Sequence, residues 1–157
     1  MKNNIFNRAQ TNFELQNIAQ KLNLPVKIVM KDELKGSIPD GNYIVNLQNH
    51  NQNGSHWTGL FKHKNKYYYA DSFGIVLPQT LIDNLNINPI NVYFLDKQIQ
   101  DINSQLCGFF ALYFLFKMNT NYGVNIKLNL KSYIETFDLT DIKNNNQIIK
   151  YIFNNIV

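Results

Sequence analysis

The chain has 157 residues, of which 45% are hydrophobic and 17% charged, so it is suited to one domain with its own core and is not a disordered chain. Its single cysteine excludes an internal disulfide and favours a reducing compartment such as the cytosol or nucleus. A net charge of +4 is mildly basic. The lysines are scattered apart from “KHKNK” at 62–66, which reads as a solvated turn, so a dedicated nucleic-acid surface is disfavoured.

The N-terminal stretch “MKNNIFNRAQ” has no apolar segment long enough for a signal peptide. No run reaches the roughly 18 apolar residues of a membrane span. Neither a linker nor an internal repeat divides the chain. We therefore expect residues 1–157 to form a single domain that is not secreted.

The first predicted element is a helix over 11–24, “TNFELQNIAQKLNL”, which a proline then ends. Thr11 is the expected N-cap residue, and Glu14, three residues later, completes a capping box. The apolar residues that fall near one face of this helix are Phe13, Ile18 and Leu22.

The remaining elements are several strands, a helix, one more strand and then three helices. In chain order they are a strand at 25–30, a strand at 42–47, a hairpin at 56–73, a helix at 77–85, a strand at 90–95, a helix at 107–118, and helices near 130–137 and 146–156. This order predicts an α+β fold with a mixed, mainly antiparallel central sheet packed by helices.

Cys107 stands where a polar loop gives way to the apolar run “CGFFALYFLF”. The cysteine thiolate is the reactive form, and the positive end of a helix dipole together with a neighbouring imidazolium favours it. Gly108 allows another backbone or a substrate to approach closely. The alternative is a buried helical cysteine that acts as a small hydrophobe, and this stretch alone favours that alternative.

A nucleophilic cysteine needs a histidine base, and the chain has three histidines. His50 lies in an Asn-rich loop and His63 in the charged hairpin turn, whereas His56 lies where a loop enters a strand. Asp71 ends the second strand of the same hairpin, which brings it beside His56, where it can hold the imidazole in one tautomer. The alternatives are a surface histidine and an ordinary turn aspartate.

Other chemistries lack their motifs. The histidine spacing fits no zinc pattern, and no CxxC pair is present, so no metal site is expected. The chain has no phosphate-binding glycine loop and no GxSxG nucleophile elbow.

The stretches “GSHW”, “YYYADSFG” and “QDINSQLCGFF” together resemble the adenain and ubiquitin-like-protein protease superfamily of cysteine peptidases. The resemblance implies a catalytic triad of His56, Asp71 and Cys107 in that chain order, with the nucleophile at the N-terminus of a buried helix. It also implies that Trp57 and Gly108 flank a narrow substrate groove that accepts small residues, such as glycine, before the scissile bond. No cofactor is implied.

The resemblance further implies an oxyanion hole built from a glutamine side chain and the backbone N–H of Cys107. In adenovirus-type members the glutamine precedes the cysteine by seven residues and a serine precedes it by three. Gln100 and Ser104 fit that spacing, whereas Gln105 is only two residues away and is the weaker candidate.

Further segments, including “PDGNYIVNLQNHNQNGSHW” and “DLTDIKNNNQIIKYI”, are similar to proteases of virophages, polinton-like elements and large DNA viruses. That subgroup, and the absence of an N-terminal extension, imply a monomeric maturation protease that cleaves capsid or virion precursors. Such a protease would act in the host cytoplasm or viral factory and in the virion, with DNA or a peptide as a weak activator. The alternatives are a deubiquitinase or SUMO-type isopeptidase, an acetyltransferase, and a non-catalytic basic DNA-binding or scaffold module.

Overall fold

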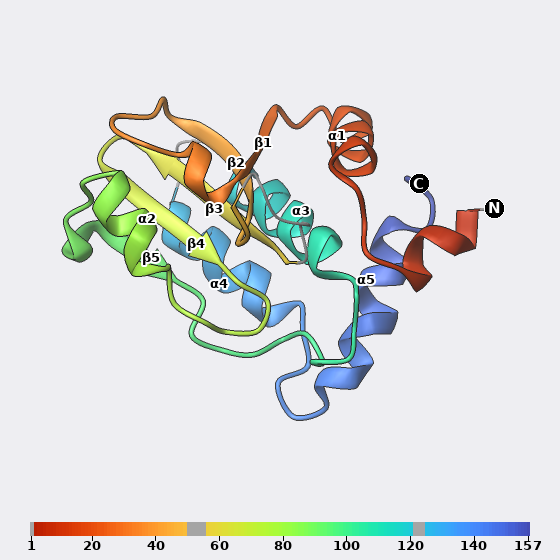
Figure 1. Cartoon of the computed structure of the whole chain (residues 1–157). Coiled ribbons are helices and arrows are strands. Elements are labelled where there is room, and N and C mark those ends of the chain that lie inside the picture. Colours follow the sequence, from red (N-terminus) through yellow and green to blue (C-terminus); the bar gives the residue numbers. More distant parts are fainter. Residues whose placement is uncertain (1, 50–55, 121–124) are drawn as a thin grey trace.

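A five-stranded sheet with helices on both faces organises the chain, and the computed structural model describes residues 2–49, 56–120 and 125–157 (Figure 1). The α-helices are α1 Asn12–Lys21, α2 Gln79–Asn84, α3 Cys107–Met118, α4 Ile126–Glu135 and α5 Asn145–Phe153. The strands are β1 Val26–Met30, β2 Gly41–Asn46, β3 Trp57–His63, β4 Lys66–Ala70 and β5 Val92–Phe94. Short 3₁₀ helices are η1 Lys2–Asn7, η2 Lys31–Glu33, η3 Pro89–Asn91 and η4 Ile142–Asn144.

The sheet is mixed, with the strands in the order β1-β2-β3-β4-β5. The two inner pairs, β2–β3 and β3–β4, are antiparallel, and the two outer pairs are parallel. The predicted α+β class with a mixed sheet is therefore confirmed, and the antiparallel part is its centre. The β3–β4 hairpin turns at Lys64, whose φ of 57° is the left-handed conformation that tight hairpin turns require.

Alternate residues of each strand supply two separate cores. Ile44, Phe61 and Tyr68 point to the face covered by α3, with α1, α4 and α5 around it. Their neighbours, including Tyr43 and Tyr69, point to the opposite face, which α2 covers. The period of two along a strand produces this division.

The helix α1 begins as its sequence predicts. Thr11 is the N-cap, and Glu14 completes the capping box. Its buried residues are Leu15, Ile18 and Ala19. The expectation for Phe13 is wrong, because this residue is 80% exposed: the buried stripe of the helix lies on the Leu15–Ile18 side.

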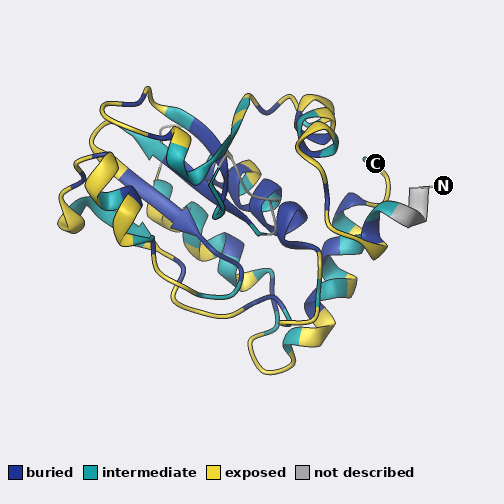
Figure 2. Cartoon of the chain, viewed as in Figure 1, coloured by how far each residue is buried: buried dark blue, intermediate teal, exposed yellow. Residues whose placement is uncertain are grey.

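Helix α3 is the centre of the larger core and is buried along most of its length (Figure 2). It lies directly against β3, since a Cβ atom added at Gly59 would lie 2.7 Å from Cδ2 of Phe114 and 3.3 Å from the carbonyl oxygen of Ala111. The helix starts at Cys107, so its first turn lies at the end of the sheet where β3 begins. None of the helices within the described residues is both long and apolar enough to span a bilayer.

Candidate active site

His56 and Asp71 form a direct hydrogen bond at the open end of the β3–β4 hairpin. The distance from His56 Nε2 to Asp71 Oδ1 is 2.8 Å. The hairpin pairs Gly59 with Ala70, and the same register continued outward brings residue 56 opposite 73 and within reach of residue 71. The local hairpin thus positions this pair, as the sequence predicts.

Asp71 is completely buried and is held by the turn that follows it. Its Oδ1 also accepts a bond from the backbone N–H of Phe73 at 2.9 Å. Its Oδ2 has no hydrogen-bond partner among the described residues. A buried carboxylate needs a counter-charge, and the imidazole of His56 is the group placed to supply it.

Phe73 fixes the plane of the His56 ring. The two rings are stacked, with their centroids 4.6 Å apart and an interplanar angle of 13°. Phe73 belongs to the stretch “YYYADSFG”, from which no role for it was predicted. An aromatic residue two positions after an acid is the signal that could have indicated this stacking.

Cys107 is the first residue of α3 and is 3% exposed. Its sulfur accepts the backbone N–H of Trp57 at 3.4 Å, so the residue after His56 contacts the cysteine directly. The sulfur therefore lies at the N-terminus of α3, within hydrogen-bond distance of a backbone N–H. Cys107 is thus both a buried core residue and a neighbour of His56, so burial in the core does not separate it from the histidine.

The surroundings of His56 set its charge. Burial acts to lower its pKa, but the hydrogen bonds to Asp71 and Cys107 and the charges of these groups outweigh burial and raise the pKa from 6.5 to about 9. The imidazolium therefore predominates at neutral pH. Because Nε2 is bonded to Asp71, Nδ1 is the ring nitrogen left for the sulfur.

The motif around Gly74 attaches the turn after Asp71 to the loop before Cys107. Gly74 has a φ of 78°, and a Cβ atom there would lie 2.8 Å from the backbone nitrogen of Gln98. The backbone N–H groups of Ile99 and Gln100 both donate to the carbonyl oxygen of Ser72, at 2.9 and 3.0 Å. Only glycine permits this close approach with this backbone conformation.

Gln100 is completely buried and its amide is fixed at both ends. Its Oε1 accepts a short hydrogen bond from the Ser72 hydroxyl, and its Nε2 donates to the carbonyl oxygen of Ser104 at 2.9 Å. The Ser104 hydroxyl accepts the N–H of Leu106 at 3.2 Å, immediately before Cys107. Gln105 is exposed. Ser72 and Ser104 orient Gln100 in the loop that leads to the cysteine.

Trp57 and Gly108 lie in tight internal packing. Trp57 is 7% exposed, and its indole N–H donates to the carbonyl oxygen of Gln10 at 2.9 Å. A Cβ atom at Gly108 would lie 2.7 Å from Cδ2 of Leu15 and 2.8 Å from Oε1 of Gln10. The close approach that Gly108 permits is therefore made by side chains of the N-terminal segment.

A pocket of about 350 Å³ lies beside the loop before Cys107. Its lining residues are Phe6, Asn7, Asn103, Ser104, Gln105, Leu106, Asn146 and Lys150. No local pattern of the sequence indicates this pocket, because η1 and α5 are far apart in the chain and meet only in the fold.

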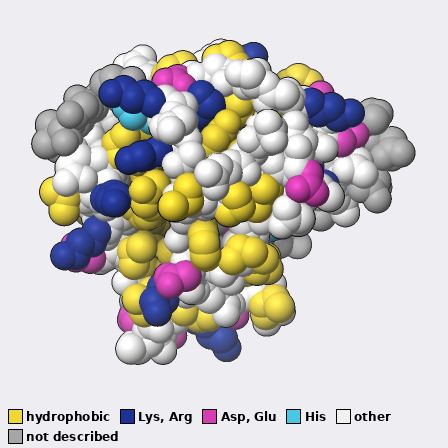
Figure 3. Space-filling model, turned by 90° about the vertical axis from the view of Figure 1, so that its left-hand side faces the viewer, with side chains coloured by type: hydrophobic (Ala, Val, Ile, Leu, Met, Phe, Trp, Pro, Cys, Tyr) yellow, Lys and Arg dark blue, Asp and Glu magenta, His cyan; other side chains and the backbone are white. Residues whose placement is uncertain are grey.

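Of the other two histidines, only His63 lies within the described residues. His50 lies outside the described residues. His63 ends β3, seven residues from His56 and on the order of 20 Å away along the strand. It lines a pocket of about 300 Å³ with Lys64, Lys66 and Lys127, and Figure 3 shows lysine or arginine side chains gathered around a histidine on this face.

No known family profile matches the chain, and no curated protein matches it. Among solved structures, the chain is similar to the ASFV pS273R protease, with a TM-score of 0.35 and 16% sequence identity. The match covers 68% of this chain and 43% of that one, so it spans less than half of the ASFV protein. The function proposed below rests on the side chains of the site and not on this likeness.

Proposed function

We propose that the chain is a cysteine peptidase in which Cys107 is the nucleophile, His56 the general base and Asp71 the residue that orients the base. The observation that carries this proposal is the 2.8 Å bond between His56 and Asp71 beside the first residue of α3. A buried acid, a histidine with a raised pKa and a cysteine at a helix N-terminus are the parts that nucleophilic thiol catalysis requires.

In acylation, the Cys107 thiolate attacks the carbonyl carbon of the scissile peptide bond and forms a C–S bond. The imidazolium of His56 then gives its proton to the nitrogen of the leaving amine as the C–N bond breaks. In deacylation, neutral His56 takes a proton from water, which attacks the thioester and releases the acid and the thiolate. Asp71 keeps its charge and holds the ring throughout.

The negative oxygen of the tetrahedral intermediate needs hydrogen-bond donors that are already in place. We assign this role to the backbone N–H of Cys107 and to the Gln100 amide. The bonds from Ser72 and Ser104 support this assignment, since they limit the amide to one orientation. One N–H of that amide donates to Ser104, which leaves the second N–H for a ligand.

The substrate class follows from the resemblance of the motifs around His56, Asp71 and Cys107. Virion or capsid precursor proteins are the proposed substrates, with small residues such as glycine before the cleaved bond. By the same resemblance, Trp57 and Gly108 are the proposed walls of a narrow groove; in the fold, both also pack against the N-terminal segment. A protease of this kind acts as a monomer without a cofactor, inside the host cell and in the virion.

The test is to co-express the chain with capsid proteins encoded beside it and to sequence any new N-termini. Cleavage after small residues that stops with Cys107→Ala supports the proposal. Hydrolysis of ubiquitin or SUMO conjugates without capsid cleavage would show the isopeptidase alternative instead. Absence of hydrolysis in both assays would refute the peptidase.

The resemblance also suggests an activator, either DNA or a peptide. The pocket lined by His63, Lys64, Lys66 and Lys127 favours an anion, because it contains no carboxylate among its lining residues. Peptide hydrolysis should be measured with and without short duplex DNA. Salt-dependent stimulation that is lost in Lys64→Ala/Lys66→Ala supports DNA, and unchanged rates exclude it.

A further inference from the structure

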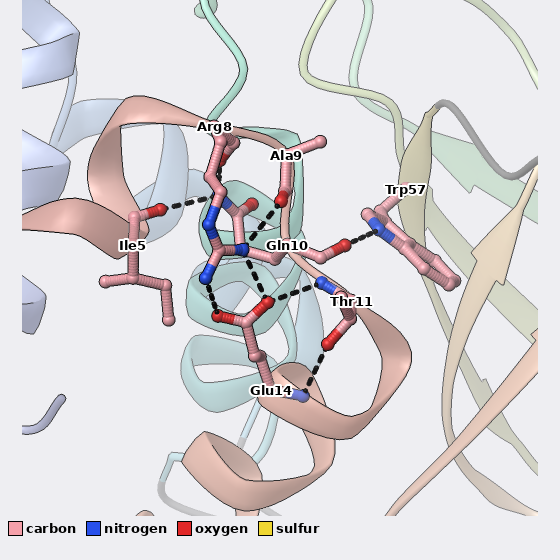
Figure 4. Close-up of polar contacts among 7 residues, drawn as sticks. All are labelled: Ile5, Arg8, Ala9, Gln10, Thr11, Glu14 and Trp57. Carbon is pink, nitrogen blue, oxygen red and sulfur yellow. Dashed lines mark hydrogen bonds and ion pairs between the residues drawn. The ribbon is translucent and has the colours of Figure 1, made fainter.

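Gln10 is a buried residue between η1 and α1 that the proposed catalytic machinery does not include. It is 3% exposed, and its amide donates to the carbonyl oxygens of Ile5 at 3.2 Å and of Arg8 at 2.6 Å. Its own carbonyl oxygen accepts the indole N–H of Trp57 at 2.9 Å (Figure 4). These bonds close the segment into a loop and direct one carbonyl at the residue after His56.

Trp57 is thereby held at two points. Its indole N–H is bonded to Gln10, and its backbone N–H is directed at the sulfur of Cys107 at 3.4 Å. The ring and the peptide group of one residue cannot rotate independently when both are hydrogen-bonded and 93% of the residue is buried. The orientation of the N–H that contacts the sulfur therefore depends on the carbonyl of Gln10.

The Gln10 side chain also contacts the catalytic helix. Its Oε1 is 2.8 Å from the position of a Cβ atom at Gly108 and has no hydrogen-bond partner among the described residues. A buried oxygen without a partner is costly, and its retention calls for a reason. Gln10 thus touches the neighbour of the base on one side and the neighbour of the nucleophile on the other.

The first turn of α1 anchors this loop. Arg8 forms two bonds to the carboxylate of Glu14, at 2.7 and 2.9 Å. Glu14 and Thr11 exchange the two bonds of the capping box, at 3.0 and 3.1 Å (Figure 4). The Arg8–Glu14 bonds span Gln10 and limit its position, whereas both capping-box bonds lie on its C-terminal side and do not involve it.

We propose that Gln10 is a positioning residue for the thiol chemistry. It holds Trp57 so that the Trp57 backbone N–H donates to the Cys107 sulfur, which keeps the sulfur beside the imidazole of His56. This inference rests on the proposed function in that Cys107 is taken as the nucleophile. It adds a part of the chain outside the triad and the oxyanion hole to the machinery.

Three variants test it. Gln10→Met keeps length and apolar packing but loses both amide donors, which frees the loop. Trp57→Phe keeps an aromatic ring but loses the indole donor. Thr11→Ala is the control, because it removes the helix cap, worth about 1 kcal/mol, without touching Trp57.

Two readouts are available that do not require a substrate. The chain has one cysteine, so the rate of alkylation by iodoacetamide reports Cys107 alone. It has one tryptophan, so the wavelength and quenching of intrinsic fluorescence report Trp57 alone. Cooperative thermal unfolding shows that each variant is folded.

We expect Gln10→Met and Trp57→Phe to lower the alkylation rate about tenfold, the equivalent of one hydrogen bond. In Gln10→Met the fluorescence should shift to longer wavelength and become more open to quenching. Thr11→Ala should stay within about twofold of the unmodified chain, in line with a cap that does not contact the sulfur. If Gln10→Met does not fold, Trp57→Phe against Thr11→Ala decides the question.

The proposal is overturned if both variants keep normal alkylation, or if Thr11→Ala slows alkylation equally. The two proposals fail separately. Alkylation that depends on Gln10 in a chain without hydrolysis refutes the peptidase but keeps the positioning role. Hydrolysis that is indifferent to Gln10→Met refutes the positioning role alone.

Discussion

Asp71→Asn removes the charge that faces His56 while it keeps the shape of the side chain. The oxygen that accepts from His56 at 2.8 Å and from Phe73 at 2.9 Å can stay in place in the variant. The negative charge that helps to raise the pKa of His56 is lost. The lowering effect of burial then acts with less opposition, so the pKa of His56 must fall.

The size of the effect follows from the two pKa values. At pH 7.5 a group with a pKa of about 9 is about 97% protonated. A group at the ordinary value near 6.5 is only about 10% protonated at that pH. The imidazolium therefore declines about tenfold, and the loss of tautomer control multiplies this. We expect peptide hydrolysis to fall by roughly 10² to 10⁴.

The bond between His56 and Asp71 should also make the free energy of unfolding depend on pH. Because the pKa of His56 is raised on folding to about 9, its contribution is fully present below about pH 6.5 and is lost as the pH rises through 9. The difference between these values corresponds to on the order of 3 kcal/mol. Urea unfolding from pH 6 to 10 should show this decline in the unmodified chain and a much flatter curve in Asp71→Asn.

The refuting result is a variant that keeps both its hydrolysis rate and the slope of its stability between pH 6.5 and 9. That outcome would show that Asp71 is a structural turn residue and that another group sets the charge of His56. If Asp71→Asn does not unfold cooperatively at any pH, the pKa of His56 should be measured in the unmodified chain from its imidazole proton signals. Titration of those signals near 6.5 would contradict the raised pKa.

Four further predictions concern the same site. Cys107→Ala should lower peptide hydrolysis by on the order of 10⁶, and a variant that remains active in the same peptide assay would contradict the mechanism. His56→Ala should abolish alkylation of the cysteine near neutral pH while His63→Ala leaves it unchanged; equal losses would show that the base is misassigned. Gln100→Ala should slow hydrolysis of one peptide substrate by roughly 10² to 10³, and Gln105→Ala should slow it far less. The reverse ranking would assign the oxyanion donor to Gln105 instead. Peptide libraries should yield cleavage after small residues, and a preference for large ones would reject a narrow groove.

Much of the fold could be predicted because its signals are local. The capping box at Thr11 and Glu14 and the hairpin that joins His56 to Asp71 each depend on a few neighbouring residues. The change from a polar loop to a continuous apolar run also indicated the buried helix that begins at Cys107. Within such short ranges, side-chain spacing and turn chemistry decide the structure.

Other features depend on contacts that no local pattern contains. The bond between Trp57 and Gln10 joins residues 47 positions apart, and the contact of Gly108 with Leu15 joins two helices. Phe13 fell near the expected apolar face but is exposed, since the helix turns its Leu15 side toward α3. Only the assembled packing shows which face of α1 is covered.

The hairpin that joins His56 and Asp71 has a consequence for the order in which the site can form. Those residues are separated by 15 positions, a short loop whose closure costs little chain entropy. The contact of Cys107 with Trp57 spans 50 positions and exists only after α3 has docked against Gly59 of β3. A chain that has not yet reached Cys107 can thus form the His56–Asp71 bond but not the contact of Trp57 with the sulfur. On the proposed function, an unfinished chain therefore carries a preformed histidine–aspartate pair but cannot hydrolyse a peptide bond until α3 has docked.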